Sequence, residues 1–148
     1  ILSVYLKDGR VVIVLAGSPY TGRATERLAG DVFDGSVYAL PKGALGLEIH
    51  GNDAVNAITG SAGSDRIYGY GGIDQLDGGP GDDTLFGGAG DDTLTDPSPG
   101  DADTLHGGPG ADSVFALDGD DLDRVLTDAD DVPVTDGGDA VAPDDSSQ

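Results

Sequence analysis

The middle of the chain is built from a nine-residue unit that repeats in tandem. Residues 78–95 read GGPGDDTLFGGAGDDTLT, which is one unit written twice without a gap. A frame of this kind predicts a stack of similar structural units, each too small to bury a hydrophobic face alone. Eight units keep the frame across residues 51–126, interrupted by two-residue insertions at 96–97 and 116–117, and they begin at residues 51, 60, 69, 78, 87, 98, 107 and 118.

Two positions of the unit carry the chemistry. Position eight is a single aliphatic residue, and we expect it to fill a thin interior; these residues are Ile58, Ile67, Leu76, Leu85, Leu94, Leu105, Val114 and Val125. Position six is a carboxylate in every unit except the first, which has an amide. The position-six residues are Asn56, Asp65, Asp74, Asp83, Asp92, Asp103, Asp112 and Asp123.

The glycines at positions one, two and four predict a tight turn before each position-six residue. Glycine adopts positive φ at little steric cost, so we expect all three to do so and to turn backbone carbonyls inward. Carbonyl and carboxylate oxygens are the ligands of Ca²⁺, which takes six to eight of them. We expect the additional acids at position five, Asp82 and Asp91, to face solvent rather than to bind a cation.

The unit resembles the repeats-in-toxin (hemolysin-type) nonapeptide family, whose consensus is Gly-Gly-x-Gly-x-Asp-x-aliphatic-x. The resemblance covers residues 51–126, about half of the chain. It implies an all-β fold, a right-handed parallel β-roll of two short-strand sheets with calcium in the turns.

In such a roll two units make one coil, so the resemblance implies that each cation lies between one unit and the second unit after it. About six Ca²⁺ ions would be bound by the pairs Asn56/Asp74, Asp65/Asp83, Asp74/Asp92, Asp83/Asp103, Asp92/Asp112 and Asp103/Asp123. Further ligands would be backbone carbonyls near Gly69, Gly71, Gly78, Pro80, Gly87, Ala89, Gly107 and Pro109.

The eight units are not equally good matches to the consensus. Units 69–95 have the best turns, so we expect the Asp74/Asp92 site to be the strongest, although Tyr70 and Ile73 depart from the pattern. The neutral Asn56 at one end, and acids in place of the position-four glycine at Asp101 and Asp121, predict weak sites at both ends of the roll.

The flanks divide the chain into three parts. In residues 1–50, Asp8-Gly9 is a type I′ turn signal, and it predicts a hairpin that pairs Leu6 with Val11 and Val4 with Ile13. This hairpin is either a cap on the first coil or the end of an upstream domain. Residues 21–30 suggest a short helix, and 36–41 and 44–50 suggest strands. After the roll (51–126), residues 127–148 have the composition of an acidic, flexible tail.

Composition excludes several classes of function. With 28 Asp and Glu against 7 Lys and Arg, the formal charge is −21, which disfavours nucleic acid and anionic membranes and favours cations. No apolar run approaches the roughly 18 residues of a membrane span, so we expect no membrane insertion. The two histidines, His50 and His106, form no zinc-protease motif, no serine nucleophile elbow is present, and we therefore expect no enzyme in this chain.

We interpret the chain as a calcium-binding, calcium-folded module of a type I secreted bacterial protein, found outside the cell or at its surface. Two alternatives stay open. One is a structural or adhesive subunit of a surface layer, coat or matrix, which would contact other chains through the hairpin or the sheet faces. The other is an accessory module of a secreted hydrolase or polysaccharide-modifying enzyme. An outward aromatic stripe of Tyr68, Phe86, His106 and Phe115 is compatible with either alternative.

Overall fold

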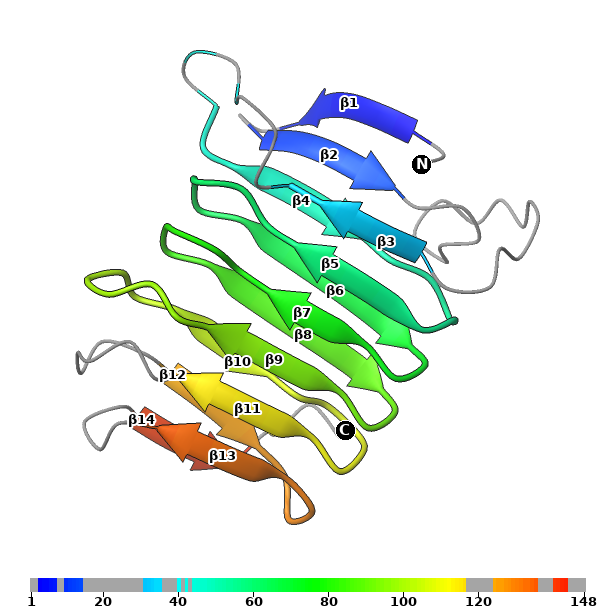
Figure 1. Cartoon of the computed structure of the whole chain (residues 1–148), viewed down its shortest axis with the longest axis vertical. Coiled ribbons are helices and arrows are strands. Elements are labelled where there is room, and N and C mark those ends of the chain that lie inside the picture. Colours follow the sequence, from blue (N-terminus) through cyan, green and yellow to red (C-terminus); the bar gives the residue numbers. More distant parts are fainter. Residues whose placement is uncertain are drawn as a thin grey trace.

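The protein is a stack of short strands wound into two parallel sheets that face each other. The structure, a computed structural model, describes residues 3–7, 10–14, 31–35, 40, 42, 44–116, 124–135 and 140–143. Within these ranges every regular element is a strand, and no helix is long and apolar enough to cross a lipid bilayer. Figure 1 shows successive coils stacked along the long axis of the molecule. The predicted all-β parallel roll is confirmed.

Successive strands of the roll alternate between the two sheets. The eight-stranded sheet has the order β1 (Ser3–Lys7), β2 (Arg10–Val14), β4 (Leu47–His50), β6 (Arg66–Gly71), β8 (Thr84–Ala89), β10 (Thr104–His106), β12 (Arg124–Thr127), β14 (Ala140–Pro143). The six-stranded sheet has the order β13 (Val132–Thr135), β11 (Ser113–Ala116), β9 (Thr93–Asp96), β7 (Gln75–Asp77), β5 (Asn56–Thr59), β3 (Asp31–Asp34).

The repeat length sets the register between neighbouring strands. Ile67 pairs with Leu85, two nine-residue units further on, and Leu85 pairs with Leu105, two units plus the inserted 96–97. Each strand of the repeat begins at or just after position six and contains position eight, and the residues on either side, often threonine, are at least partly exposed except for the buried Leu126. This alternation, with β-branched residues on the outward side, is typical of a strand that is buried on one face.

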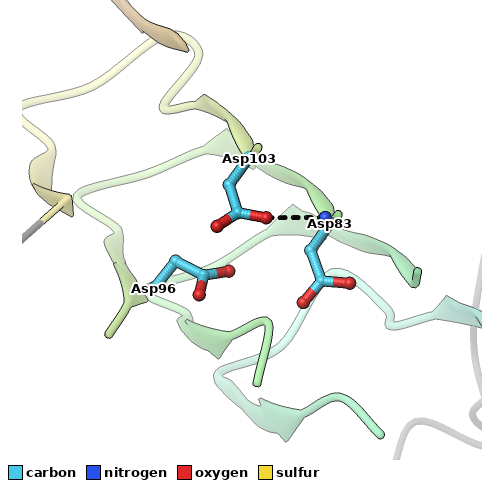
Figure 2. A group of neighbouring side chains, drawn as sticks. All are labelled: Asp83, Asp96 and Asp103. Carbon is cyan, nitrogen blue, oxygen red and sulfur yellow. Dashed lines mark hydrogen bonds between the residues drawn. The ribbon is translucent and has the colours of Figure 1, made fainter. Parts of the chain in front are cut away.

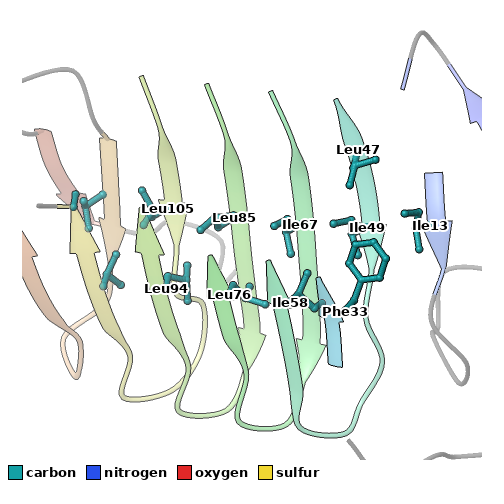
Figure 3. Close-up of a cluster of buried hydrophobic side chains, with 13 residues drawn as sticks. Ile13, Phe33, Leu47, Ile49, Ile58, Ile67, Leu76, Leu85, Leu94 and Leu105 are labelled. Atoms are coloured by element: carbon teal, nitrogen blue, oxygen red, sulfur yellow. The ribbon is translucent and has the colours of Figure 1, made fainter. Parts of the chain in front are cut away.

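The predicted interior residues form the core of the roll. All eight position-eight aliphatics are buried, and Figure 3 shows them in two facing rows, one from each sheet. Residues from before the repeat extend these rows at the N-terminal end: Ile13, Phe33, Leu47 and Ile49. One aliphatic residue per unit is therefore the whole interior along most of the roll.

The N-terminal hairpin is joined to the roll by hydrogen bonds. β1 and β2 pair as predicted, with Leu6 opposite Val11 and Val4 opposite Ile13. β2 then pairs in parallel with β4, where Ile13 lies beside Ile49, so the hairpin is the first part of the eight-stranded sheet. The expected strand at 44–50 is present as β4, while most of 36–41 and the helix expected at 21–30 lie outside the described residues. β3, which the sequence did not predict, starts the other sheet.

Four aromatic rings form a column on the outward face of the eight-stranded sheet. The ring centroids are 4.8 Å apart for His50 and Tyr68, 4.9 Å for Tyr68 and Phe86, and 4.8 Å for Phe86 and His106. The predicted stripe is correct for three of its members and wrong for Phe115, because β11 belongs to the other sheet. His50 takes its place, since the residue before the first unit has the same register as position nine of the later units.

Two strands follow the repeat, in the segment where composition suggested a flexible tail. β13 pairs with β11 and β14 pairs with β12, so each sheet continues for one more strand. Short apolar runs, VPVT and AVAP, are enough to extend an existing parallel ladder even in an acidic segment. The nitrogen of Val132 donates to the carbonyl of Asp112, so by strand alternation the nitrogen of Pro133 faces the free edge of β13.

Replacing a central core residue tests whether this thin interior stabilises the roll. We expect Leu85→Ala, which removes a fully buried side chain between two coils, to lower the free energy of unfolding by about 2–5 kcal/mol. Ile73→Ala is the control, because Ile73 is 57% exposed and should change stability by less than about 0.5 kcal/mol. Urea unfolding under identical cation conditions measures both, and equal effects of the two substitutions would contradict this account of the core.

Candidate metal centre

The position-six residues form two stacks, one along each edge of the roll. Each lies immediately before a strand or at its first residue, so the stacking of coils places equivalent side chains above one another. The stack before the eight-stranded sheet contains Asp65, Asp83 and Asp103. The stack before the six-stranded sheet contains Asn56, Asp74, Asp92 and Asp112. All seven side chains are buried.

One carboxylate oxygen of each residue holds the preceding coil in place. Oδ1 of Asp74 accepts a hydrogen bond from the backbone N–H of Asn56 at 2.7 Å, and Oδ1 of Asp92 accepts one from Asp74 at 2.8 Å. The same bond joins the next pair of the stack, from Asp92 to Asp112, at 2.7 Å. In the other stack, Asp65 donates to Asp83 at 2.6 Å and Asp83 donates to Asp103 at 2.7 Å. Five of the six predicted pairs are therefore in direct contact from coil to coil, and the sixth, Asp103/Asp123, includes a residue outside the described ranges.

The second oxygen has no hydrogen-bond partner at several of these positions. Oδ2 is buried and unpartnered in Asp74, Asp83, Asp92 and Asp112. A buried carboxylate oxygen without a donor costs free energy, so an arrangement that repeats it four times indicates that another group normally satisfies it.

The position-one glycines form the floor beneath these oxygens. A Cβ atom at Gly69 would overlap Oδ2 of Asp74 and the carbonyl oxygen of Gly87 in the next coil. At Gly87 it would lie 2.5 Å from Oδ2 of Asp92 and 2.6 Å from the carbonyl oxygen of Gly107. Each turn thus brings a carboxylate oxygen and a carbonyl oxygen from different coils together over a residue that has no side chain. We call this oxygen-lined space a cup.

The glycines at positions two and four have a different role. Gly79, Gly88 and Gly108 at position two and Gly72, Gly81, Gly90 and Gly110 at position four have positive φ. The prediction that position one also needs positive φ was wrong, because those glycines are required by close packing instead. Tyr70 occupies position two with φ 80°, and its hydroxyl lies 2.8 Å from Nδ1 of His50. That hydrogen bond offsets part of the cost of a left-handed tyrosine.

The predicted carbonyl ligands are only in part available. The position-one carbonyl oxygens of Gly78, Gly87 and Gly107 lie at the cup of the preceding coil, and that of Gly107 also accepts a hydrogen bond from the Gly88 amide at 2.9 Å. Among the position-three carbonyls, that of Ala89 accepts a hydrogen bond from Gly72 and that of Pro109 accepts one from Gly90, both at 3.0 Å. Those two carbonyls therefore help to join the coils, whatever else they bind.

Without a cation the buried carboxyls hold their protons to unusually high pH. Burial is the main cause that raises the pKa of Asp83 to about 8, the Asp65 amide lowers it, and the charges of Asp65 and Asp103 raise it. Burial likewise raises the pKa of Asp92 to about 6 and that of Asp112 to about 7. The cups therefore disfavour carboxylate charge unless a cation compensates it.

Near the N-terminal end, donors from the protein form hydrogen bonds in two of the cups. The side-chain amide Nδ2 of Asn56 donates to the carbonyls of Asn52 and Ala54 and to Oδ1 of Asp74. Both oxygens of Asp65 accept hydrogen bonds, Oδ2 from the Ser61 amide and Oδ1 from the Ser61 hydroxyl and the Leu47 amide. Both Asp65 oxygens are thus satisfied by the protein, whereas Oδ1 of Asn56 is buried without a hydrogen-bond partner.

Other predicted and unpredicted acids are placed as follows. Asp123 lies outside the described residues. Asp82 and Asp91 are exposed, as expected, and accept hydrogen bonds from Ala102 and Ala111 of the next coil, both at 3.1 Å. Asp131, which was not predicted, accepts a hydrogen bond from the Asp112 amide at 3.1 Å and continues that stack. The sequence marks Asp131 only by its place directly before a strand. The repeat pattern does not reveal it, because Pro133 stands where a unit has its aliphatic residue.

A further acid, Asp96, was not predicted because it lies in the two-residue insertion between units. It is 1% exposed, and neither carboxylate oxygen has a hydrogen-bond partner. Burial is the main cause that raises the pKa of Asp96 to about 9, and the charges of Asp103 and Asp83 add to it. The Ser98 amide lies near enough to lower this pKa somewhat, but it forms no hydrogen bond of normal geometry.

The donor set fits calcium. It consists of oxygens only, from carboxylates and backbone carbonyls, and Ca²⁺ is the biological cation that binds many such oxygens with flexible geometry. The Oδ2 atoms have no hydrogen-bond partner, and the glycine floors bring them together with carbonyl oxygens more closely than a Cβ atom would allow. Asp74, Asp83, Asp92 and Asp112 would each supply a charged ligand.

Comparison with known protein families supports the same chemistry. The family model described as the RTX calcium-binding nonapeptide repeat (4 copies) matches residues 50–80, 68–95 and 100–122. Comparison with curated proteins and with solved structures gave no match. The matched segments contain the stacked aspartates and the glycine cups, and they stop short of both flanks. Through residues 50–122, this chain belongs to the RTX calcium-binding nonapeptide repeat family.

Proposed function

We propose that this chain is a calcium-folded module of an exported bacterial protein, in which calcium joins neighbouring coils of the roll. The observation that carries the proposal is the set of buried, unpartnered Oδ2 atoms in Asp74, Asp83, Asp92 and Asp112. Calcium binding itself is the property of the repeat family; the ligand residues and the coupling to folding are what we propose here.

The cation sites in this proposal are the cups of Asp74/Asp92, Asp83/Asp103 and Asp92/Asp112. The Asn56/Asp74 cup contributes less because Asn56 offers a neutral oxygen in place of a carboxylate, and the Asp65/Asp83 cup contributes less because both Asp65 oxygens already accept hydrogen bonds. The Asp103/Asp123 pair stays part of the proposal from sequence alone. Calcium would therefore hold the middle of the roll, while direct hydrogen bonds hold its N-terminal end.

Export gives such a module a physical rationale. Where calcium is scarce, folding is disfavoured, because a chain with formal charge −21 repels itself and its narrow aliphatic core buries little apolar surface. Outside the cell, where calcium is abundant, the same carboxylates become ligands and the chain condenses. This supports a secreted or cell-surface location, with calcium as the first partner and other protein chains contacting the sheet faces. The repeat family is a structural calcium-binding module, and the proposal includes no catalytic step.

A calcium titration of the 148-residue chain tests the proposal. Far-UV circular dichroism should gain β-signal cooperatively when Ca²⁺ is added, because ligand binding to the folded state alone shifts the equilibrium towards it. Magnesium at the same concentration should have little effect, because it dehydrates reluctantly and demands octahedral geometry. A spectrum that is fully β in chelator, with no response to calcium, would contradict calcium-coupled folding.

The adjacent acids Asp91 and Asp92 provide a matched pair of substitutions. Asp92→Asn keeps an oxygen for the Asp74 amide but removes the charge that faces the cup, so we expect the half-folding calcium concentration to rise about tenfold. Asp91→Asn removes the same charge from an exposed position and should shift the midpoint little. Indistinguishable midpoints for the two variants would remove Asp92 from the proposed ligands.

The raised pKa values predict opposite pH dependence without and with calcium. The folded, calcium-free chain binds more protons than the unfolded chain between about pH 4 and pH 8, because the pKa of Asp83 rises from 3.8 to about 8 and that of Asp112 to about 7. Stability of the calcium-free roll therefore falls as pH rises through this window. Calcium requires deprotonated carboxylates, so its affinity should rise with pH.

Circular dichroism at pH 5.5 and pH 8.5 measures both effects. In calcium-free buffer the β-signal should be greater at pH 5.5, and the calcium midpoint should be lower at pH 8.5. A calcium-free chain that folds better at the higher pH would mean that the buried carboxyls do not control its stability.

A further inference from the structure

The insertion at 96–97 places an aspartate where the repeat normally has glycine. Unit 87–95 ends at Thr95, so Asp96 is the residue at which position one of the next unit would begin. The register agrees with this placement. Asp77 pairs with Thr95, and the Gly78 amide donates to the Thr95 carbonyl, so the coil containing Asp96 lies directly beside Gly78.

Asp96 changes the composition of the cup over Gly78. In the cups over Gly60, Gly69 and Gly87, the neighbouring coil contributes the backbone carbonyl of a position-one glycine. Over Gly78, the nearest atom of the neighbouring coil is Oδ2 of Asp96, and Oδ2 of Asp83 lies beside it. A charged oxygen therefore takes the place of a neutral one at this single cup among the residues that the structure describes.

Three carboxylates converge in this cup. Asp83, Asp96 and Asp103 each place one oxygen within 4.8 Å of an oxygen of the other two, and Figure 2 shows the Asp96 carboxylate directed towards Asp83 and Asp103. All three side chains are at most 2% exposed. The Asp103 carboxylate accepts a hydrogen bond from the Asp83 amide at 2.7 Å, so the stacking of the coils holds these two residues side by side.

The Asp96 side chain has no other evident partner. Both of its oxygens are buried without a hydrogen bond, whereas Asp83 and Asp103 each use one oxygen to join coils. A charged carboxylate buried against two others is unfavourable unless a cation lies among them. An acid that served only solubility or turn formation would face solvent, as Asp82 and Asp91 do.

We propose that Asp96 is a third carboxylate ligand that makes the Asp83/Asp96/Asp103 cup a distinct calcium site, tighter than the repeat cups with two carboxylates. The proposal rests on the calcium-binding function proposed above and adds a ligand that the nine-residue pattern does not contain. A third charge strengthens the attraction for Ca²⁺, because calcium affinity follows the number of charged ligands and the rigidity of the site. The two-residue insertion thus adds a ligand as well as length.

Isothermal titration calorimetry with Ca²⁺ on the intact 148-residue chain tests the assignment. Asp96→Asn should weaken the tightest site by about tenfold or more while the weaker sites stay unchanged. Asp96→Gly should do the same and should fold normally in calcium, because it restores the position-one residue of the repeat. The control is Asp53→Asn, which removes the same charge from an exposed position in the first unit and should leave the tightest site intact.

Each outcome separates this proposal from the proposed function. A wild-type chain that binds no calcium overturns both. Calcium binding by the wild type with unchanged affinity in Asp96→Asn and Asp96→Gly overturns the Asp96 site alone. Displacement of calcium from the tightest site by equimolar Mg²⁺ overturns its assignment to calcium.

A crystal structure of the wild type grown with calcium gives a test that needs no variant. It should show an ion about 2.3–2.6 Å from an Asp96 carboxylate oxygen and from oxygens of Asp83 and Asp103. An ion in this cup with Asp96 beyond that distance would show that Asp96 is not a ligand.

Discussion

The fold depends on carboxylate groups that contact two coils at once. In the middle of the stacks each aspartate uses Oδ1 to accept the backbone amide of the equivalent residue one coil earlier, while Oδ2 is buried without a hydrogen-bond partner; these residues are Asp74, Asp83, Asp92 and Asp112. The first contact sets the spacing and register of the coils, and the second leaves a buried charge that needs a counter-ion. Structural and ligand-binding roles therefore reside in the same side chain, which explains why a roll with so narrow an interior is built around buried acids.

The contacts between coils are unchanged across the two-residue insertion at 96–97. Where two residues are inserted, the Asp83–Asp103 and Asp92–Asp112 bonds have the same length as bonds across coils of regular length. Leu85 and Leu105 remain in register as well. The insertion begins at Asp96, the last residue of β9, and continues into the following turn, so it leaves the contacts of positions six to eight unchanged. The turn can therefore vary, and at Asp96 the variation brings a charged group into a cup.

The nine-residue frame predicted the interior residues of the roll, and the family resemblance that it carries predicted the parallel roll and which acids are neighbours. The hairpin pairing was predicted separately, because the Asp8-Gly9 turn fixes the register of the two strands. It was insufficient for β3, β13 and β14, whose pairing depends on an existing ladder rather than on their own pattern.

At the site, the frame identified the stacked residues but assigned one role to all of them. It could not show that Asn56 and Ser61 fill the first cups with protein donors, because this depends on side-chain directions within the turn. The prediction that the position-one glycines need positive φ was wrong, because positive φ and close packing both require glycine and the sequence does not distinguish them. Asp96 was missed because an insertion has no assigned position until the coils are stacked.

The proline in β13 determines how the stack ends. A parallel roll exposes, at each end, unpaired backbone groups that invite another strand, and an identical copy of the chain offers a matching one. With the Pro133 nitrogen at the free edge, that edge lacks one of the donors a further coil would need. At the opposite end, the antiparallel β1 presents the wrong strand direction for another parallel coil. At each end of the stack, one of the two outer strands is therefore a poor template for a further parallel coil.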